Sequence, residues 1–208
     1  VFPLDLPGHG PDAEGDTAAV RLEECVQSIN RAVEREALHD LVLVGHGFSG
    51  SLVLQAAAEL PQPPKRIVLV AGIVPAQQRT LISAYSQRAR IGYRLFSFLS
   101  SLSRQEFKLP SYAIYSYLCN TMDTMAVVQT LGFFGPLPTR VLKSRISLGE
   151  NGLPSPLTYV VLTQDKVIAP DAQKQTAERF GSEEIVEIEA CHQVMLQKPE
   201  QLAEVLLR

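Results

Sequence analysis

The ten residues from 41 to 50, LVLVGHGFSG, constrain the fold more than any other part of the chain. An apolar run that ends in closely spaced glycines is typical of a buried β-strand that enters a sharp turn and continues as a helix. Such a turn holds its central residue at a positive φ and needs small residues two positions before and after it. Gly45, Gly47 and Ser49 meet this requirement. We therefore expect a tight strand, turn and helix with the bend at Gly47.

The residue at the bend of such a turn is the nucleophile in serine enzymes that carry the pattern GxSxG. Gly47 has no side chain and offers no nucleophilic atom. Ser49 could act as a displaced nucleophile, but that register would shorten the following helix by two residues, so we favour Gly47 as the nucleophile position. The backbone N–H of Phe48 would still serve as one oxyanion donor, because it does not depend on the side chain at position 47.

Composition and charge limit the class of protein. A chain of 208 residues with 46% hydrophobic content can bury the core of one compact domain without disulfides or metals. The net charge of -3 and the dispersed basic residues indicate no nucleic-acid partner, and no apolar stretch approaches the roughly 20 residues of a membrane span. Cys25, Cys119 and Cys191 form no CxxC pair, so we expect neither a disulfide framework nor a structural zinc site, and a reducing, cytoplasmic location.

Strand-like apolar runs alternate with helical segments along most of the chain. We expect strands at residues 1–4, 41–44, 67–70, 157–162 and 185–188, and helices at 17–37, 51–60 and 171–180, with a last helix near the C-terminus. This order predicts an α/β fold with a doubly wound, mostly parallel sheet. The chain opens directly on a predicted strand without an initiating methionine, so we expect it to be trimmed and to lack the first strands of the sheet.

Residues 75–152 break this alternation and hold much of the aromatic content. We expect them to form a helical cap insert over the strand ends, with residues 1–74 and 153–208 as the core. Ligand sites in open α/β sheets lie outside the carboxyl ends of the strands, so some cap aromatics should line a pocket for an apolar ligand, while most pack the cap against the core. These aromatics are Tyr85, Tyr93, Phe96, Phe98, Phe107, Tyr112, Tyr115, Tyr117, Phe133 and Phe134.

Four segments together give the chain a resemblance to the α/β-hydrolase family. LDLPGHG at 4–10 is similar to the strand and loop before the first cap-side helix, VLVGHGFSG at 42–50 to the nucleophile elbow, TYVVLTQDKVIAP at 158–170 to the acid strand, and ACHQVMLQKPEQLAEVL at 190–206 to the histidine loop and last helix. The acid and histidine segments are most similar to the branch of methylesterases and hydroxynitrile lyases and its bacterial relatives. The resemblance implies an α/β-hydrolase fold with glycine in place of the nucleophilic serine.

An aspartate and a histidine follow the turn in the order nucleophile, acid, histidine. Asp165 stands at the carboxyl end of an apolar strand, where its carboxylate could orient an imidazole, although an aspartate there also commonly caps the next helix. His192 lies in the loop before the final helix. We predict that the two form a dyad near Gly47.

Four further residues are candidates for ligand binding: His46, Ser49, His9 and Tyr115. His46 could equally be structural, packed beneath the turn, and His9 could be an ordinary surface residue. No spacing of His, Asp and Glu indicates a metal site, and no dinucleotide-binding glycine pattern is present, so we expect no metal and no cofactor.

These observations predict an enzyme that acts on a small, mostly apolar ester or related carbonyl compound, with the Asp165 and His192 dyad as general base. The glycine would be a natural loss or an engineered inactivation of a serine esterase. Two alternatives stay open, namely a non-catalytic ligand-binding protein of this fold and a lyase or isomerase that uses the dyad. We expect a small-molecule partner, no nucleic acid and no membrane, and a homodimer is possible.

Overall fold

The computed structural model describes residues 1–10, 16–76, 79–103, 107–146 and 155–208. Four parallel strands form one sheet in the order β1-β2-β3-β4, which is also their order along the chain. The strands are β1 (Val42–His46), β2 (Arg66–Val70), β3 (Leu157–Leu162) and β4 (Glu184–Ile188). Because the strands are parallel, their carboxyl ends meet at one edge of the sheet, where loops carry the candidate site residues.

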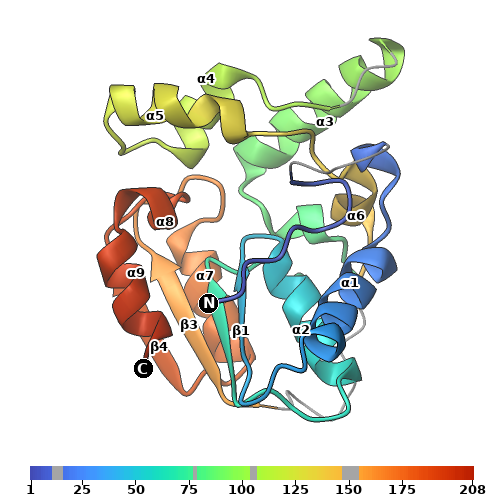
Figure 1. The fold of residues 1–208 in the computed structure, drawn as a ribbon. Helices are drawn as coiled ribbons and strands as arrows, with labels where there is room; N and C mark the ends of the chain where they lie inside the picture. The colour runs from blue at the N-terminus through green and yellow to red at the C-terminus, as the bar shows by residue number, and fades with distance from the viewer. Residues whose placement is uncertain (11–15, 77–78, 104–106, 147–154) are drawn as a thin grey trace.

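Helices cover both faces of this sheet (Figure 1). One face packs against α1 (Leu22–Arg35), α2 (Ser49–Glu59) and α7 (Pro170–Arg179), and the other against α8 (Val194–Gln197) and α9 (Pro199–Leu206). Successive residues of a strand point to opposite faces, so Leu69 packs in the first core and Val68 in the second. Burial on both sides explains why β3 reads as a continuous apolar run. The predicted parallel sheet with helices on both faces is confirmed.

Residues 75–152, which we call the insert, connect β2 to β3, and most of the helices described there lie above the carboxyl ends of the strands (Figure 1). Helices are the main regular elements in the described part of the insert, and loops and two isolated β-bridges, Thr80 with Arg145 and Lys108 with Pro136, lie between them. Its elements are η2 (Leu81–Ala84), α3 (Gln87–Ser103), α4 (Ser111–Ala113), η3 (Ile114–Leu118), α5 (Thr124–Thr130), η4 (Leu131–Phe133) and α6 (Thr139–Lys143). The insert has small apolar clusters of its own, one around Tyr93 and another around Ile114.

The N-terminal region departs from the sequence prediction. Residues 1–4 are exposed and form no strand, so the strand predicted there is wrong. The apolar run is short, and Pro3 has no N–H to give to a ladder. The predicted helix at 17–37 is shorter than expected, because a 3₁₀ turn, η1 (Thr17–Ala19), precedes α1 and the chain between them is extended at Arg21.

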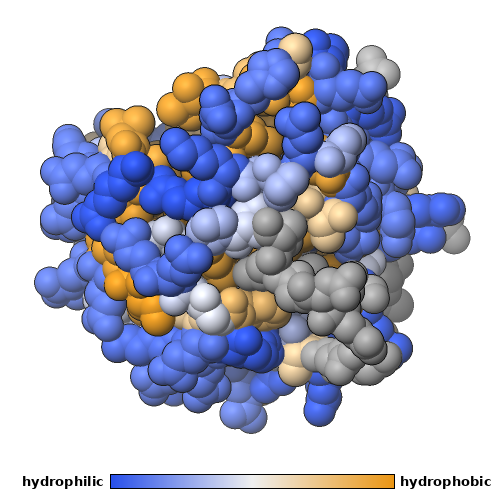
Figure 2. All heavy atoms as spheres, turned by 90° about the horizontal axis from the view of Figure 1, so that it is seen from below, coloured by the Kyte–Doolittle hydropathy of each residue, from blue (hydrophilic) through white to orange (hydrophobic). Residues whose placement is uncertain are grey.

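The face opposite the insert is mainly hydrophilic, with hydrophobic residues in smaller patches (Figure 2). The apolar side chains of the sheet are instead buried against the helices on its two faces. Within the described ranges, no helix combines the length and the apolar character that a membrane crossing requires.

Candidate active site

The turn between β1 and α2 consists of only two residues, because the strand ends at His46 and the helix begins at Ser49. Gly47 has a φ of 56°, in the left-handed region that favours glycine. At Gly45 an added Cβ would lie 2.8 Å from the backbone oxygen of Ser49, which is too close for any side chain. The bend predicted at Gly47 is therefore confirmed. Ser49 is the first residue of the helix and does not stand at the bend.

Backbone hydrogen bonds hold this turn against the end of β2. The N–H of Gly47 donates to the carbonyl oxygen of Val70 at 3.1 Å, and the carbonyl oxygen of Gly47 accepts from the N–H of Ile73 at 2.7 Å. The N–H of Phe48 donates to no acceptor among the described residues. This N–H is thus available to a group that approaches the bend.

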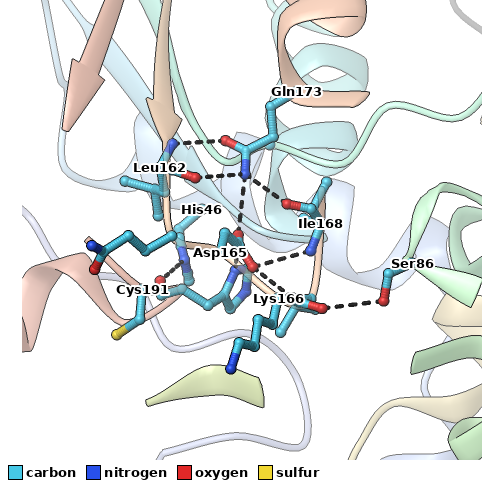
Figure 3. A network of polar contacts seen from close by, with 12 residues as sticks. His46, Ser86, Leu162, Asp165, Lys166, Ile168, Gln173 and Cys191 are labelled. Carbon is cyan, nitrogen blue, oxygen red and sulfur yellow. Dashed lines mark hydrogen bonds and ion pairs between the residues drawn. The ribbon is translucent and has the colours of Figure 1, made fainter. Parts of the chain in front are cut away.

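Asp165 lies in the loop after β3 and is almost fully buried, with 4% of its surface exposed. Its Oδ1 accepts the backbone N–H groups of Val167 at 2.7 Å and Ile168 at 3.0 Å. Its Oδ2 accepts from the Nε2 of Gln173 at 3.3 Å and from the Nδ1 of His192 at 2.7 Å. These contacts fix the orientation of the carboxylate (Figure 3). The carboxylate braces its own loop and does not cap α7, whose N-cap residue is Ala169.

Gln173, a fully buried residue of α7, supports the acid loop from behind (Figure 3). Its Oε1 accepts the N–H of Leu162 at 2.9 Å, and its Nε2 donates to the carbonyl oxygen of Ile168 at 2.8 Å as well as to Asp165. The sequence analysis missed this residue. One feature of the sequence could have pointed to it. Gln173 stands four positions before Ala177 and so shares the buried face of the helix, where a polar side chain needs hydrogen-bond partners.

His192 lies in the loop between β4 and α8 and is buried. A carboxylate accepts hydrogen bonds, so the Nδ1–H of His192 donates to Asp165. The other ring nitrogen of His192, Nε2, faces the turn at Gly47. A Cβ added to Gly47 would lie 3.2 Å from this Nε2. The structure therefore brings Asp165, His192 and Gly47 together in a row, as the sequence predicted.

His46 stands next to His192, with the two ring centroids 4.4 Å apart. Its Nε2–H donates to the backbone oxygen of His192 at 2.8 Å. Burial, together with the neighbouring His192, lowers the pKa of His46 to about 3. His46 is therefore neutral near pH 7 and acts as a fixed donor that steadies the histidine loop.

A cavity of about 390 Å³ opens in front of Gly47 and His192, between the turn and the insert. His46 and Ser49 also line it, so both stand where a ligand could be contacted, and their binding roles stay predictions. The insert contributes a mostly aromatic and aliphatic lining, including Tyr85, Tyr93, Tyr112, Tyr117, Leu137 and Phe134. Arg88 adds a cation, and burial raises the pKa of Tyr85, so that its phenol stays neutral. A volume of this size suits a small organic molecule.

The other predicted binding residues, His9 and Tyr115, are not among the described residues that line this cavity, and their roles in binding stay predictions. Tyr115 is 47% exposed and its hydroxyl contacts the Thr124 hydroxyl at 3.3 Å. Residues two apart in a helix point to nearly opposite sides, and it is Tyr117 that lines the cavity. The His9 ring lies 6.5 Å from the Phe48 ring, beside the turn.

Cys25, Cys119 and Cys191 are buried free thiols. Burial raises the pKa of Cys25 and of Cys119 to about 11, which keeps these two thiols protonated and poorly nucleophilic. In the part of the chain that the structure describes, no group of three or more His, Cys, Asp and Glu side chains is placed to hold a metal ion.

Comparison with known proteins identifies similar chains along the full length. Methylesterase 9 of Arabidopsis thaliana is 25% identical over 220 residues, which cover 100% of this chain and 86% of that protein. An extracellular alpha/beta-hydrolase from a Paenibacillus species, described as homologous in structure and function to tobacco salicylic acid binding protein 2, superposes with a TM-score of 0.83 at 20% identity, over 98% of this chain and 84% of its own. Because that relative is extracellular, the cytoplasmic location expected here stays a prediction.

Tomato methylketone synthase I in complex with 2-tridecanone superposes with a TM-score of 0.75 at 17% identity, over 98% of this chain and 84% of its own. A variant of the same tomato protein has been solved with beta-ketoheptanoate. At this level of identity the likeness concerns the fold. A sequence model of the alpha/beta hydrolase family matches residues 1–205, which is nearly the whole chain. The turn, the acid loop and the histidine loop thus lie in a chain that belongs to the alpha/beta hydrolase family.

Proposed function

We propose that this protein is an enzyme that acts on a small, mostly apolar ester or related carbonyl compound, with the Asp165 and His192 dyad as its general base. The observation that carries the proposal is the position of the Nε2 of His192, 3.2 Å from where a Cβ on Gly47 would stand. At that distance the Oγ of a serine would come within hydrogen-bonding reach of the imidazole. Gly47 would therefore occupy the nucleophile position, with the base still in place.

Hydrolysis in this site would proceed without an acyl-enzyme, because Gly47 has no oxygen to acylate. A water molecule between Nε2 and the substrate carbonyl would lose a proton to His192, and Asp165 would stabilise the imidazolium. The resulting hydroxide would attack the carbonyl carbon, and the N–H of Phe48 would donate to the oxyanion. When the ester C–O bond breaks, His192 would return the proton to the leaving alkoxide.

The insert would act as a cap that selects the substrate, with residues 1–74 and 153–208 as the catalytic core. Tyr85, Tyr93 and Phe134 place aromatic surface around the cavity, which favours an apolar acyl or alkyl group. The esterase name of the Arabidopsis relative supports an ester as the substrate class.

A second candidate reaction is the decarboxylation of a β-keto acid to a methyl ketone. It is favoured by the likeness to tomato methylketone synthase I, whose solved complexes hold a β-keto acid and a methyl ketone. Loss of CO₂ from such an acid needs a proton donor near the ketone oxygen and no protein nucleophile, so a glycine at position 47 is no obstacle. Protonated His192 could donate that proton, and Arg88 could pair with the carboxylate.

The test is a turnover assay of the purified protein with short-chain esters and with acetoacetate. We expect His192→Ala to lower turnover by about 10²- to 10⁴-fold, the usual contribution of a general base or acid. His39→Ala, at an exposed histidine outside the cavity, should leave the rate unchanged. Ester turnover that survives His192→Ala would reject the dyad mechanism.

A companion variant, Gly47→Ser, tests the nucleophile position. Ester hydrolysis that appears or rises in this variant would support an otherwise intact serine-enzyme site. If the wild-type protein turns over neither substrate and the serine variant is also silent, the binding-protein alternative replaces the enzyme proposal.

A further inference from the structure

A second hollow, of about 540 Å³, adjoins the catalytic cavity. It is bounded by residues 72–76 at the exit of β2, by the start of the insert and by α7. Tyr85 lines both hollows, and of two consecutive residues in the acid loop, Val167 lines the catalytic cavity and Ile168 lines the second hollow. The two spaces therefore share a wall, but neither Asp165 nor His192 lines the second one.

Arginines from three different segments converge on this hollow. Arg79 precedes η2, Arg90 belongs to α3 and Arg179 belongs to α7. The described residues that line the hollow include no Asp or Glu, and none of the arginines forms an ion pair with a described carboxylate. Cations brought together without a counter-charge raise the electrostatic free energy, which a bound anion would lower.

Arg90 makes the strongest case for a ligand. Its Nε is buried and has no hydrogen-bond acceptor within the described part of the chain. A buried donor that is left unpaired is costly, and in native structures a bound water, ion or ligand is one of the ways in which such a group is satisfied. Arg179 is partly committed, because one of its terminal nitrogens donates to the carbonyl oxygen of Val74. Its guanidinium also lies over the Phe180 ring, with Cζ 4.9 Å from the ring centroid, so only the edge of the group that does not face Val74 can meet an anion in the hollow.

We propose that this hollow binds a small anionic molecule through a carboxylate or phosphate group, which Arg90 and Arg179 hold while Arg79 contacts it at the exposed rim. Guanidinium groups bind both kinds of anion through paired, charge-assisted hydrogen bonds. The volume is in the range of small-molecule sites. This site goes beyond the function proposed above and does not depend on the dyad.

Isothermal titration calorimetry of the whole chain with inorganic phosphate, and separately with succinate, tests the proposal at constant ionic strength. We expect saturable binding of at least one of the two anions, and Arg90→Gln should weaken it by about tenfold or more, because a charged hydrogen-bond donor is lost. The matched control is Arg94→Gln, one turn further along α3, exposed and outside the hollow. Its affinity should stay within about twofold of the wild type, since a remote surface charge contributes little.

The two anions also separate the sources of the ligand chemistry. Binding of phosphate alone supports a phosphorylated ligand, and binding of succinate alone supports a carboxylic acid. The absence of saturable binding for both, or equal weakening by Arg90→Gln and Arg94→Gln, overturns the proposal. If circular dichroism shows that Arg90→Gln does not fold, the exposed Arg79→Gln replaces it, and an unchanged affinity in that variant overturns the proposal as well.

Discussion

The sheet side of the cavity and the insert that covers it are built in opposite ways. On the sheet side, four donors fix the Asp165 carboxylate, and Gly45 has no room for a methyl group. In the insert, no atom lies within 4 Å of a Cβ added to Gly92, and Leu95 and Met125 are more than half exposed. The contrast indicates that the sheet side holds Asp165 and the turn rigidly, whereas the insert leaves room for substitution around the cavity.

The largest expected effect comes from adding one methyl group to the rigid side. Gly45→Ala places a Cβ 2.7 Å from the Cγ2 of Val53 and 2.8 Å from the backbone oxygen of Ser49, so the turn itself must shift. We expect the free energy of unfolding to fall by about 3 kcal/mol, measured by urea denaturation.

Gly92→Ala is the matched control in the insert. It should raise the free energy of unfolding by about 0.5–1 kcal/mol, because alanine is the better helix former and the site is open. If Gly45→Ala and Gly92→Ala lower the free energy of unfolding by similar amounts, the contrast between the rigid sheet side and the open insert is contradicted.

A smaller effect is expected where the acid loop is braced. Gln173→Met leaves the N–H of Leu162 and the carbonyl oxygen of Ile168 without their side-chain partner. We expect a loss of about 2 kcal/mol in the free energy of unfolding. Any turnover should fall in kcat more than it changes KM, because the glutamine touches Asp165 and not the cavity. Gln175→Met, at an exposed position of the same helix, should leave stability nearly unchanged, and a similar loss there would argue against the brace.

The last expected effect is a pH dependence from His46. Its pKa is about 3 in the folded protein, below the ordinary value of 6.5, because burial disfavours the imidazolium. Between these values the unfolded chain binds a proton and the folded chain does not, so stability falls as the pH falls below about 6.5, by up to about 1.4 kcal/mol per pH unit. Urea denaturation at pH 7 and pH 5 measures this loss, and His46→Gln should show a shallower dependence. An equally steep dependence in His46→Gln would assign the loss to other groups.

Local sequence patterns predicted what depends on local structure. The apolar runs located β1 to β4, and the spacing of small residues located the bend at Gly47, because both are set by neighbours along the chain. Asp165 was predicted from its place at the carboxyl end of a strand, and His192 from its order after the turn and the acid, and the structure places the two in contact. The prediction of a strand at 1–4 was wrong because an extended apolar segment becomes a β-strand only where another strand pairs with it.

Contacts between distant segments could not be predicted in the same way. Gln173 supports a loop before its own helix, and although its place four positions before Ala177 indicates burial, the sequence does not say which backbone groups it meets. Tyr115 was chosen as a binding residue and Tyr117 was not, because the rotation of a short helix in the insert decides which tyrosine lines the cavity. The convergence of Arg79, Arg90 and Arg179 likewise becomes visible only when their segments are placed in space.

The left-handed backbone at position 47 also bears on how this protein can change over generations. Any residue other than glycine would carry about 1 kcal/mol or more of strain at this φ. With glycine, the free energy of unfolding is therefore higher by that amount than with a side chain at position 47. A typical substitution removes about 0.5–3 kcal/mol, and this difference is enough to tolerate one further mild change elsewhere. The lining of the cavity is where such changes would alter which molecules fit, so a glycine at the bend makes the chain more readily evolvable toward new ligands.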